Sequence, residues 1–219
     1  MNYAELSAAI KAYSENDFPQ AVGSGGLTSA EQIARFVQQA EQRIYNSIQF
    51  PALRKNVTGS ATSGNKYLGA PADWLATYSL ARINADGSYE YLLNKDVNFI
   101  REAFPYPATT GAPTHYAIFD ENTFILGPTP DASYSMELHY FYYPTSITTA
   151  GTTWLGNNFD SLLLYGSLLE AAAYMKSDAD VLKNYTDRYN EAFAMAKQLG
   201  DGKDRQDAYR SGQVRYPVK

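Results

Sequence analysis

Few side chains in this chain could perform catalysis or bind a metal. It contains two histidines, His115 and His139, and no cysteine. A metal site needs two or three converging ligands, and no carboxylate lies at a ligand spacing from either histidine. No Gly-x-Ser-x-Gly or His-Glu-x-x-His motif occurs. We therefore interpret both histidines as hydrogen-bonded strand residues, and we predict a protein that is not an enzyme and needs no cofactor or metal.

Two further features could suggest activity. Glu170 lies in the most apolar stretch of the chain, and a buried carboxylate is sometimes a catalytic acid. More often such a group pairs with an arginine or reaches solvent at a helix interface, which is our interpretation. The stretch 23–26 is Gly-Ser-Gly-Gly before a helix, but it lacks the Lys-Ser/Thr end of a phosphate-binding loop. We interpret it as a connector.

The C-terminal segment 203–219 is the best candidate for a binding site. Beyond Asp207 it contains no acidic residue, and arginines alternate there with tyrosines and valines. Such a segment is either a solvated terminus or a segment that orders on a partner, with arginines reaching carboxylates and tyrosines filling pockets. We predict the second, with the following contact residues: Arg205, Tyr209, Arg210, Arg215 and Tyr216.

The composition is that of a globular protein. Of 219 residues, 45% are hydrophobic and 19% charged, which allows a full core. The net charge of −5 does not favour DNA as the primary ligand, because nucleic-acid binding domains are usually basic. The 19 tyrosines, against 10 phenylalanines and 2 tryptophans, suit interfaces. The N-terminus lacks a signal-peptide pattern and 162–175 is too short to span a bilayer, so we expect a soluble protein.

Helical patterns occur near both ends of the chain. A short helix is predicted over 4–14. Thr28 and Glu31 form a capping box, and the apolar positions that follow predict an amphipathic helix of about five turns. The stretch 159–175 is apolar nearly all round, which predicts a central buried helix.

A long helix is predicted after residue 178. Its apolar residues recur at spacings of three and four, which gives a seam for packing against another helix. Gly200 and Gly202 are expected to end or weaken it. The seam consists of Leu182, Tyr185, Tyr189, Ala192, Ala196 and Leu199.

The middle of the chain has a strand texture, with β-branched and aromatic runs between Gly, Pro, Ser and Thr. We predict a helix over 95–104 and two hairpins. One joins 56–58 to 66–68, and the other joins 116–119 to 123–126. Further strands are expected at 74–83, 89–92 and 135–143, and the last has rings on both faces, so both faces are expected to be covered.

The predicted fold class is therefore α+β. A small helical bundle is formed by 1–53 and 146–202, with a β-rich insertion at 54–145. The extended tail is 203–219.

Six segments of the sequence resemble the head-to-tail adaptor proteins of tailed bacteriophages, the ring proteins that sit beneath the portal. Each segment is a short motif, but together they span most of the chain in order. They are 33–44 (IARFVQQAEQRI), 68–75 (LGAPADWL), 111–118 (GAPTHYAI), 126–131 (LGPTPD), 136–144 (MELHYFYYP) and 163–171 (LLYGSLLEA).

The resemblance implies a helical bundle with a β-rich extension, assembled as a ring, commonly of twelve copies, on the portal protein. It implies a tail or nozzle protein as the next partner and DNA that passes through without specific binding. The protein would be made in the host cytoplasm and lie at the head–tail junction of the virion. The C-terminal segment of such proteins docks into the portal, which corresponds here to residues 205–219 as a region.

Two other hypotheses stay open at this point. The tyrosines, with Trp74 and Trp154, suggest a carbohydrate-binding module, which would need exposed and coplanar rings. A hydrolase that uses Glu170 is the third hypothesis, although no substrate suggests itself.

Overall fold

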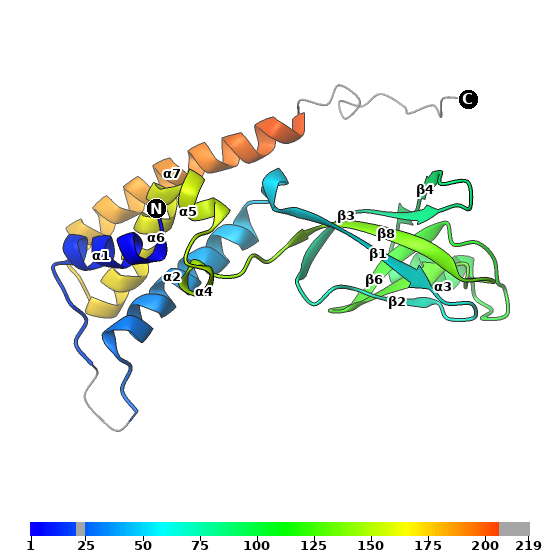
Figure 1. Cartoon of the computed structure of the whole chain (residues 1–219), viewed down its shortest axis with the longest axis horizontal. Coiled ribbons are helices and arrows are strands. Elements are labelled where there is room, and N and C mark those ends of the chain that lie inside the picture. Colours follow the sequence, from blue (N-terminus) through cyan, green and yellow to red (C-terminus); the bar gives the residue numbers. More distant parts are fainter. Residues whose placement is uncertain (21–24, 206–219) are drawn as a thin grey trace. The chain divides into compact units, whose positions relative to one another are not determined.

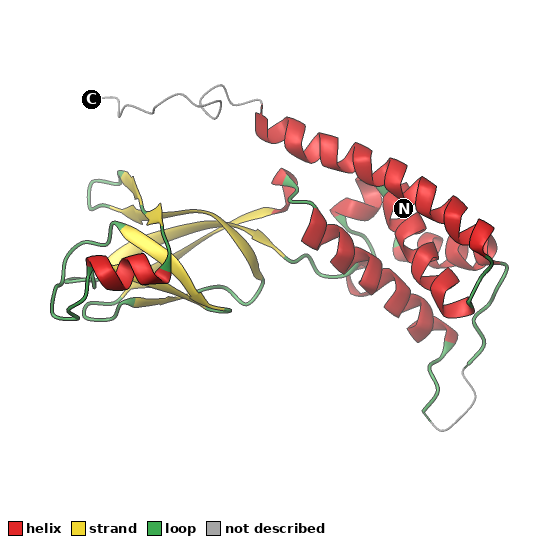
Figure 2. Cartoon of the chain, turned by 180° about the vertical axis from the view of Figure 1, so that it is seen from behind, coloured by secondary structure: helices red, strands yellow, loops and turns green. Residues whose placement is uncertain are grey.

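The computed structural model describes residues 1–20 and 25–205, without the side chains of 200–205. Its contacts divide the chain into two compact units, Met1–Pro51 with Pro144–Lys219, and Ala52–Tyr143. Helices make up the first unit, and the second contains two sheets and a helix (Figures 1 and 2). The predicted α+β class is confirmed.

The helical unit is built around α6, which packs against α1, α2 and α7. Residues of α6 are buried on most sides, as the apolar stretch predicted. The helices are α1 (Tyr3–Ser14), α2 (Ser29–Ser47), α4 (Ile147–Ala150), α5 (Trp154–Asn158), α6 (Asp160–Met175) and α7 (Ala179–Arg205).

Two sequence signals position these helices. The capping box of α2 is present, since Glu31 N donates to Thr28 Oγ1 at 3.4 Å and Thr28 N donates to Glu31 Oε2 at 2.8 Å. On α6, Gly166 allows close helix packing, because a Cβ there would lie 3.2 Å from Ala40 Cβ and 3.2 Å from the Tyr189 ring. The missing side chain therefore lets α2 and α7 approach α6 at one level.

Helix α7 is longer than the sequence predicted. Its 27 residues continue through Gly200 and Gly202 to Arg205, whereas α6 has 16 residues. Each interior glycine costs a helix only about 1 kcal/mol, so the backbone hydrogen bonds can outweigh two of them. At 1.5 Å per residue, α7 is about 40 Å long and α6 about 24 Å. The last turns of α7 thus continue past α6, as Figure 1 shows.

The apolar seam of α7 follows the same geometry. Tyr189 and Ala196 are buried, and Leu182, Tyr185 and Ala192 are half-buried. Leu199 is 41% exposed, because it lies where α6 no longer runs alongside. The seam is confirmed as far as Ala196.

The β unit contains two four-stranded sheets, ordered β1-β8-β3-β4 and β2-β7-β6-β5. Apolar residues of both sheets form one core cluster, including Leu80, Phe124, Met136 and Leu138. The 3-10 turn η1 (Pro51–Leu53) leads into the unit. Its elements are β1 (Arg54–Ala61), β2 (Tyr67–Gly69), β3 (Trp74–Ile83), β4 (Tyr89–Tyr91), β5 (Leu93–Asn94), α3 (Val97–Ala103), β6 (His115–Asp120), β7 (Thr123–Gly127) and β8 (Tyr134–Tyr142).

One predicted hairpin is wrong and the other is confirmed. The segments 56–58 and 66–68 do not pair, because β1 pairs with β8 and β2 pairs with β7 in the other sheet. Each segment therefore contributes to the shared core from a different sheet. A turn signal is local and cannot show with which distant strand a segment pairs. The hairpin β6–β7 forms as expected, with Ile118 opposite Phe124.

Both sheets have outer faces that are partly covered. Helix α3 covers the β6–β7 face, where Ile100 packs with Ala117 and Ile125. On the other sheet the Arg54 guanidinium lies 4.0 Å from the Tyr78 ring centroid, and Phe141 is buried. The expected cover of both faces of 135–143 is therefore met only in part, since Ser135 is exposed and Glu137 and His139 are half-buried.

Candidate functional site

The predicted tail site lies almost wholly outside the described residues. Arg205 is the last residue of α7, and its side chain is not described. The other four predicted contact residues, Tyr209, Arg210, Arg215 and Tyr216, lie outside the described ranges. Residues 203–205, expected in the tail, are helical, so the tail region is attached directly to the projecting end of α7.

The helical unit carries several exposed apolar side chains near this end and along α7. Met195 is 59% exposed and Leu199 41%, while Val181 at the other end of α7 is 40% exposed. Tyr13 and Tyr174 are each 53% exposed. Scattered apolar residues are normal on a surface, but a helix that overhangs its own bundle offers an edge for a neighbouring chain.

Glu170 is paired, as we interpreted it from the sequence. Its carboxylate forms an ion pair with the Arg43 guanidinium of α2, and the Glu170 side chain is 17% exposed. The ion pair joins α6 to α2, which gives Glu170 a role in helix packing. This arrangement does not favour the hydrolase hypothesis.

A second buried carboxylate, Glu41, was missed by the sequence reasoning. It is 3% exposed and its Oε1 accepts a hydrogen bond from Ile147 N at 3.0 Å. Burial raises the pKa of Glu41, although bonds from Ser146 and Ile147 oppose the shift. Glu41 thereby caps α4 and ties it to α2. The sequence signal for this burial was the position of Glu41 next to Ala40 and Ile44, on the apolar face of α2.

Both histidines lie in strands, as predicted. His115 Nδ1 is 2.8 Å from Thr114 Oγ1, and its ring lies against those of Phe99 and Phe104. Burial and the nearby Arg54 lower the pKa of His139, which favours the neutral imidazole. Among residues 1–20 and 25–205, no group of three or more His, Asp or Glu could hold a metal ion.

The two tryptophans are packing residues in separate units. Trp74 Nε1 donates to Thr77 Oγ1 at 3.1 Å, and its ring meets Phe124 edge-on at a centroid distance of 5.4 Å. Trp154 lies 5.0 Å from the Phe50 ring and 5.6 Å from that of Phe159. Neither pairing makes the flat, open platform on which sugars stack. The carbohydrate-binding hypothesis gains no support from them.

The described residues thus form a helical unit, whose helix α7 continues past α6, and an inserted β unit with its own core. A family model described as SU10 adaptor protein matches residues 1–216. The chain belongs to this family of bacteriophage head-to-tail adaptors, and it is a virion component of phage assembly. This is a family of structural proteins rather than of enzymes.

No curated protein matches the chain. Within the part of the chain that the structure describes, no helix combines the length and apolarity needed to cross a membrane.

Proposed function

We propose that this protein forms a ring beneath the portal, joins the phage head to the tail and leaves a passage for DNA. The observation that carries the proposal is the family match over residues 1–216, which includes the predicted tail. A ring of identical chains, with twelve as the expected number, needs a heterologous interface in which two different surfaces of neighbouring copies meet. A tail or nozzle protein would follow as the distal partner.

The overhang of α7 supports a role for this helix at the subunit interface. Leu199 is exposed where α7 continues past α6, and Met195 is exposed next to the buried Ala196, on a face of α7 that the bundle does not cover. Burying apolar side chains of this kind against a neighbour contributes roughly 25 cal/mol per Å² of apolar surface. We expect the neighbouring copy in the ring to bury Met195 and Leu199.

The tail beyond α7 is proposed as the portal-binding segment. Arg205, Arg210 and Arg215 would reach carboxylates of the portal, and Tyr209 and Tyr216 would fill pockets in it. The order of the chain supports this, because the rigid α7 leads straight into the basic, tyrosine-containing sequence.

Passage of DNA requires a surface that does not hold phosphates tightly. Each neutralised phosphate adds to salt-dependent affinity, so a basic channel would retard the duplex. The net charge of −5 is consistent with an unretarded passage.

Truncation after Arg205 tests the tail separately from ring formation. We expect the truncated chain to fold and assemble laterally but to lose stable attachment to purified portal protein, as measured by co-sedimentation and native mass spectrometry. A matched control replaces Lys95 and Lys183 by Gln, which removes two positive charges outside the tail and outside the stretch 195–199. Undiminished portal binding by the truncated chain would refute the tail role. A full-length chain that stays monomeric with the portal present would refute the ring.

A further inference from the structure

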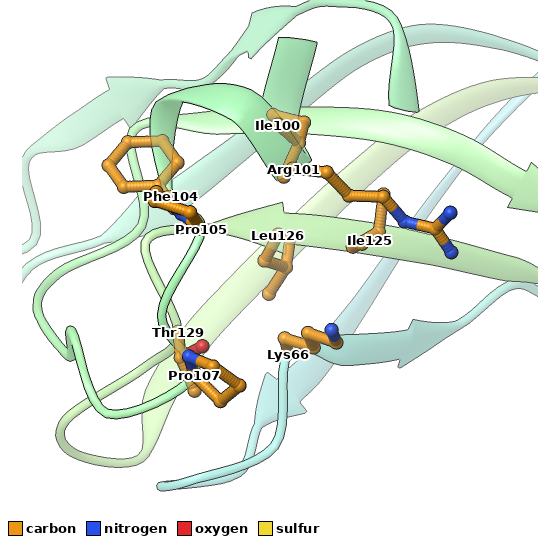
Figure 3. Close-up of a pocket in the computed structure, with 9 residues that line it drawn as sticks. All are labelled: Lys66, Ile100, Arg101, Phe104, Pro105, Pro107, Ile125, Leu126 and Thr129. Atoms are coloured by element: carbon orange, nitrogen blue, oxygen red, sulfur yellow. The ribbon is translucent and has the colours of Figure 1, made fainter. Parts of the chain in front are cut away.

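A pocket of about 370 Å³ lies in the β unit, between α3, β7 and the residue before β2. This volume is within the usual range for ligand pockets, about 300–1,000 Å³. Ile100, Ile125 and Leu126 lie beneath the pocket and are at most 2% exposed, whereas the half-buried Phe104 and the exposed Pro105 and Pro107 form an apolar wall. Figure 3 shows the nine lining residues, with Ile125 and Leu126 between Arg101 and Lys66.

Two cations border this pocket without an acidic counterpart. None of the nine lining residues is acidic. Within the described ranges, Lys66 and Arg101 form no ion pair, and each instead lies over a ring, 5.4 Å from Tyr67 and 5.6 Å from Phe119. Tyr67 and Phe119 are not among the lining residues, and a contact with a ring face leaves the N–H donors of both cations available.

The pocket is held open by backbone and packing. Lys66 O accepts a hydrogen bond from Leu126 N at 2.8 Å, which fixes the Lys66 backbone to β7. Phe104 packs closely over Gly127, where an added Cβ would lie 2.6 Å from its ring. A preformed site loses less conformational entropy when a ligand binds, because its walls are already ordered.

We infer that this pocket binds an extended segment of a partner protein, in which an aromatic or branched aliphatic side chain stands next to an Asp or Glu. The apolar side chain would pack against Phe104, Pro105 and Pro107, directly above the methyl groups of Ile100, Ile125 and Leu126, and the carboxylate would meet Arg101 and Lys66. An apolar anchor beside a charge-assisted hydrogen bond is the usual composition of an interface hot spot. Nucleic acid fits less well, because backbone recognition uses a longer stripe of cations than two.

Binding can be measured on the full-length chain carrying ¹³C-labelled Ile and Leu methyl groups. The probes are the peptide acetyl-GSFDEFSG-amide, its neutral counterpart acetyl-GSFNQFSG-amide, and a single-stranded dT oligonucleotide. We expect the acidic peptide to shift the methyl signals of Ile100, Ile125 and Leu126 in a saturable way, while Leu168 in the helical unit does not respond. The neutral peptide should bind at least tenfold more weakly.

Variants separate the two cations from the rest of the surface. The double change Lys66→Gln and Arg101→Gln should weaken binding of the acidic peptide at least tenfold. Lys95→Gln is the matched control, since Lys95 also lies over a ring, 5.3 Å from Phe99, but does not line the pocket. The inference is overturned by equal binding of both peptides, by a double variant that binds normally, by oligonucleotide shifts in place of peptide shifts, or by no shift of the three signals.

Discussion

Glu41 shows at the scale of one residue how a polar group can organise an apolar interface. An unpaired N–H group buried among apolar residues would cost about 1–3 kcal/mol. The Glu41 carboxylate accepts the bond from Ile147 N at 3.0 Å, where the chain re-enters the helical unit after the β unit. Its own burial is unfavourable when it is ionised, which is why its pKa rises.

Substitution of Glu41 by Gln should reveal this burial cost. Because the folded protein holds the proton more tightly than the unfolded chain, the contribution of Glu41 to stability is full below its unfolded pKa of about 4.3. This contribution to stability is lost as the pH rises through the pKa of Glu41 in the folded protein, which burial raises. We expect the Gln variant to equal or exceed the stability of the original chain at pH 7.5, with the difference falling towards pH 4.

Urea denaturation at both pH values measures this difference. Glu41→Ala serves as the control, since it leaves Ile147 N without its acceptor and should lose about 1–3 kcal/mol at pH 7.5. If the Gln variant were less stable than the original chain by as much as the Ala variant, the charge of Glu41 would be stabilising and our account would be incorrect.

Residue-level prediction from the sequence succeeded where one pattern allowed one interpretation. Thr28 and Glu31 form their capping box, and Glu170 has an arginine partner. Periodicity alone could not identify Arg43 as that partner, because the two residues are 127 positions apart. The pocket cations Lys66 and Arg101 were missed for the same reason.

At the scale of elements, the contact of α6 with α2 and α7 depends on the absence of one side chain. Ala40 and Tyr189 both lie within 3.2 Å of the position that a Cβ on Gly166 would take. Two helices that approach so closely gain packing along their length, and a larger residue at the crossing would push them apart.

Gly166→Val should therefore destabilise the protein by about 1–3 kcal/mol through overpacking. The double variant with Ala40→Gly should recover part of this loss, which a double-mutant cycle in urea would measure as coupling. Gly59→Val is the matched control, because nothing lies within 4 Å of its Cβ position on β1. A similar loss at both glycines would show that the effect is not due to helix packing.

Element prediction worked best where a periodic pattern was long. The strand 74–83 and the helix α6 were expected nearly at their observed bounds. Short elements such as α4, α5 and β5 were not predicted, because their four, five and two residues are too few to show a period. The incorrect hairpin at 56–68 arose from a real turn whose two flanking strands join different sheets.

At the scale of the whole molecule, each unit has its own hydrophobic core. In the β unit, Leu80, Phe124, Met136 and Leu138 belong to a cluster drawn from both sheets. In the helical unit, α6 supplies the centre. Two units with separate cores can fold separately, since each buries its own apolar surface.

We therefore expect Ala52–Tyr143, expressed alone, to fold. Circular dichroism should show a strand-rich spectrum, and thermal unfolding should be cooperative. Met136→Asp is the control, because an unpaired charge in the core should abolish the transition. An isolated unit that shows no transition and poorly dispersed amide signals would mean that it needs the helical unit in order to fold.

The sequence predicted the order of the parts and the fold class, because long amphipathic patterns and strand-rich texture are local properties. The family followed from short motifs in a fixed order, and the match over residues 1–216 agrees with it. The portal-contact residues named in the tail stay a prediction from side-chain chemistry, since such contacts depend on surfaces of other chains.

The pairing of the first strand of the β unit with its last has a consequence for how such a protein can evolve. Arg54 lies opposite Phe141 in an antiparallel pair, and such partners are about 4.5–5.5 Å apart between their Cα atoms. The inserted segment thus leaves and returns at neighbouring points, a gap that a short turn could close. Recombination could replace it with an unrelated module whose ends are equally close, so a phage could acquire a new binding surface while keeping its helical scaffold.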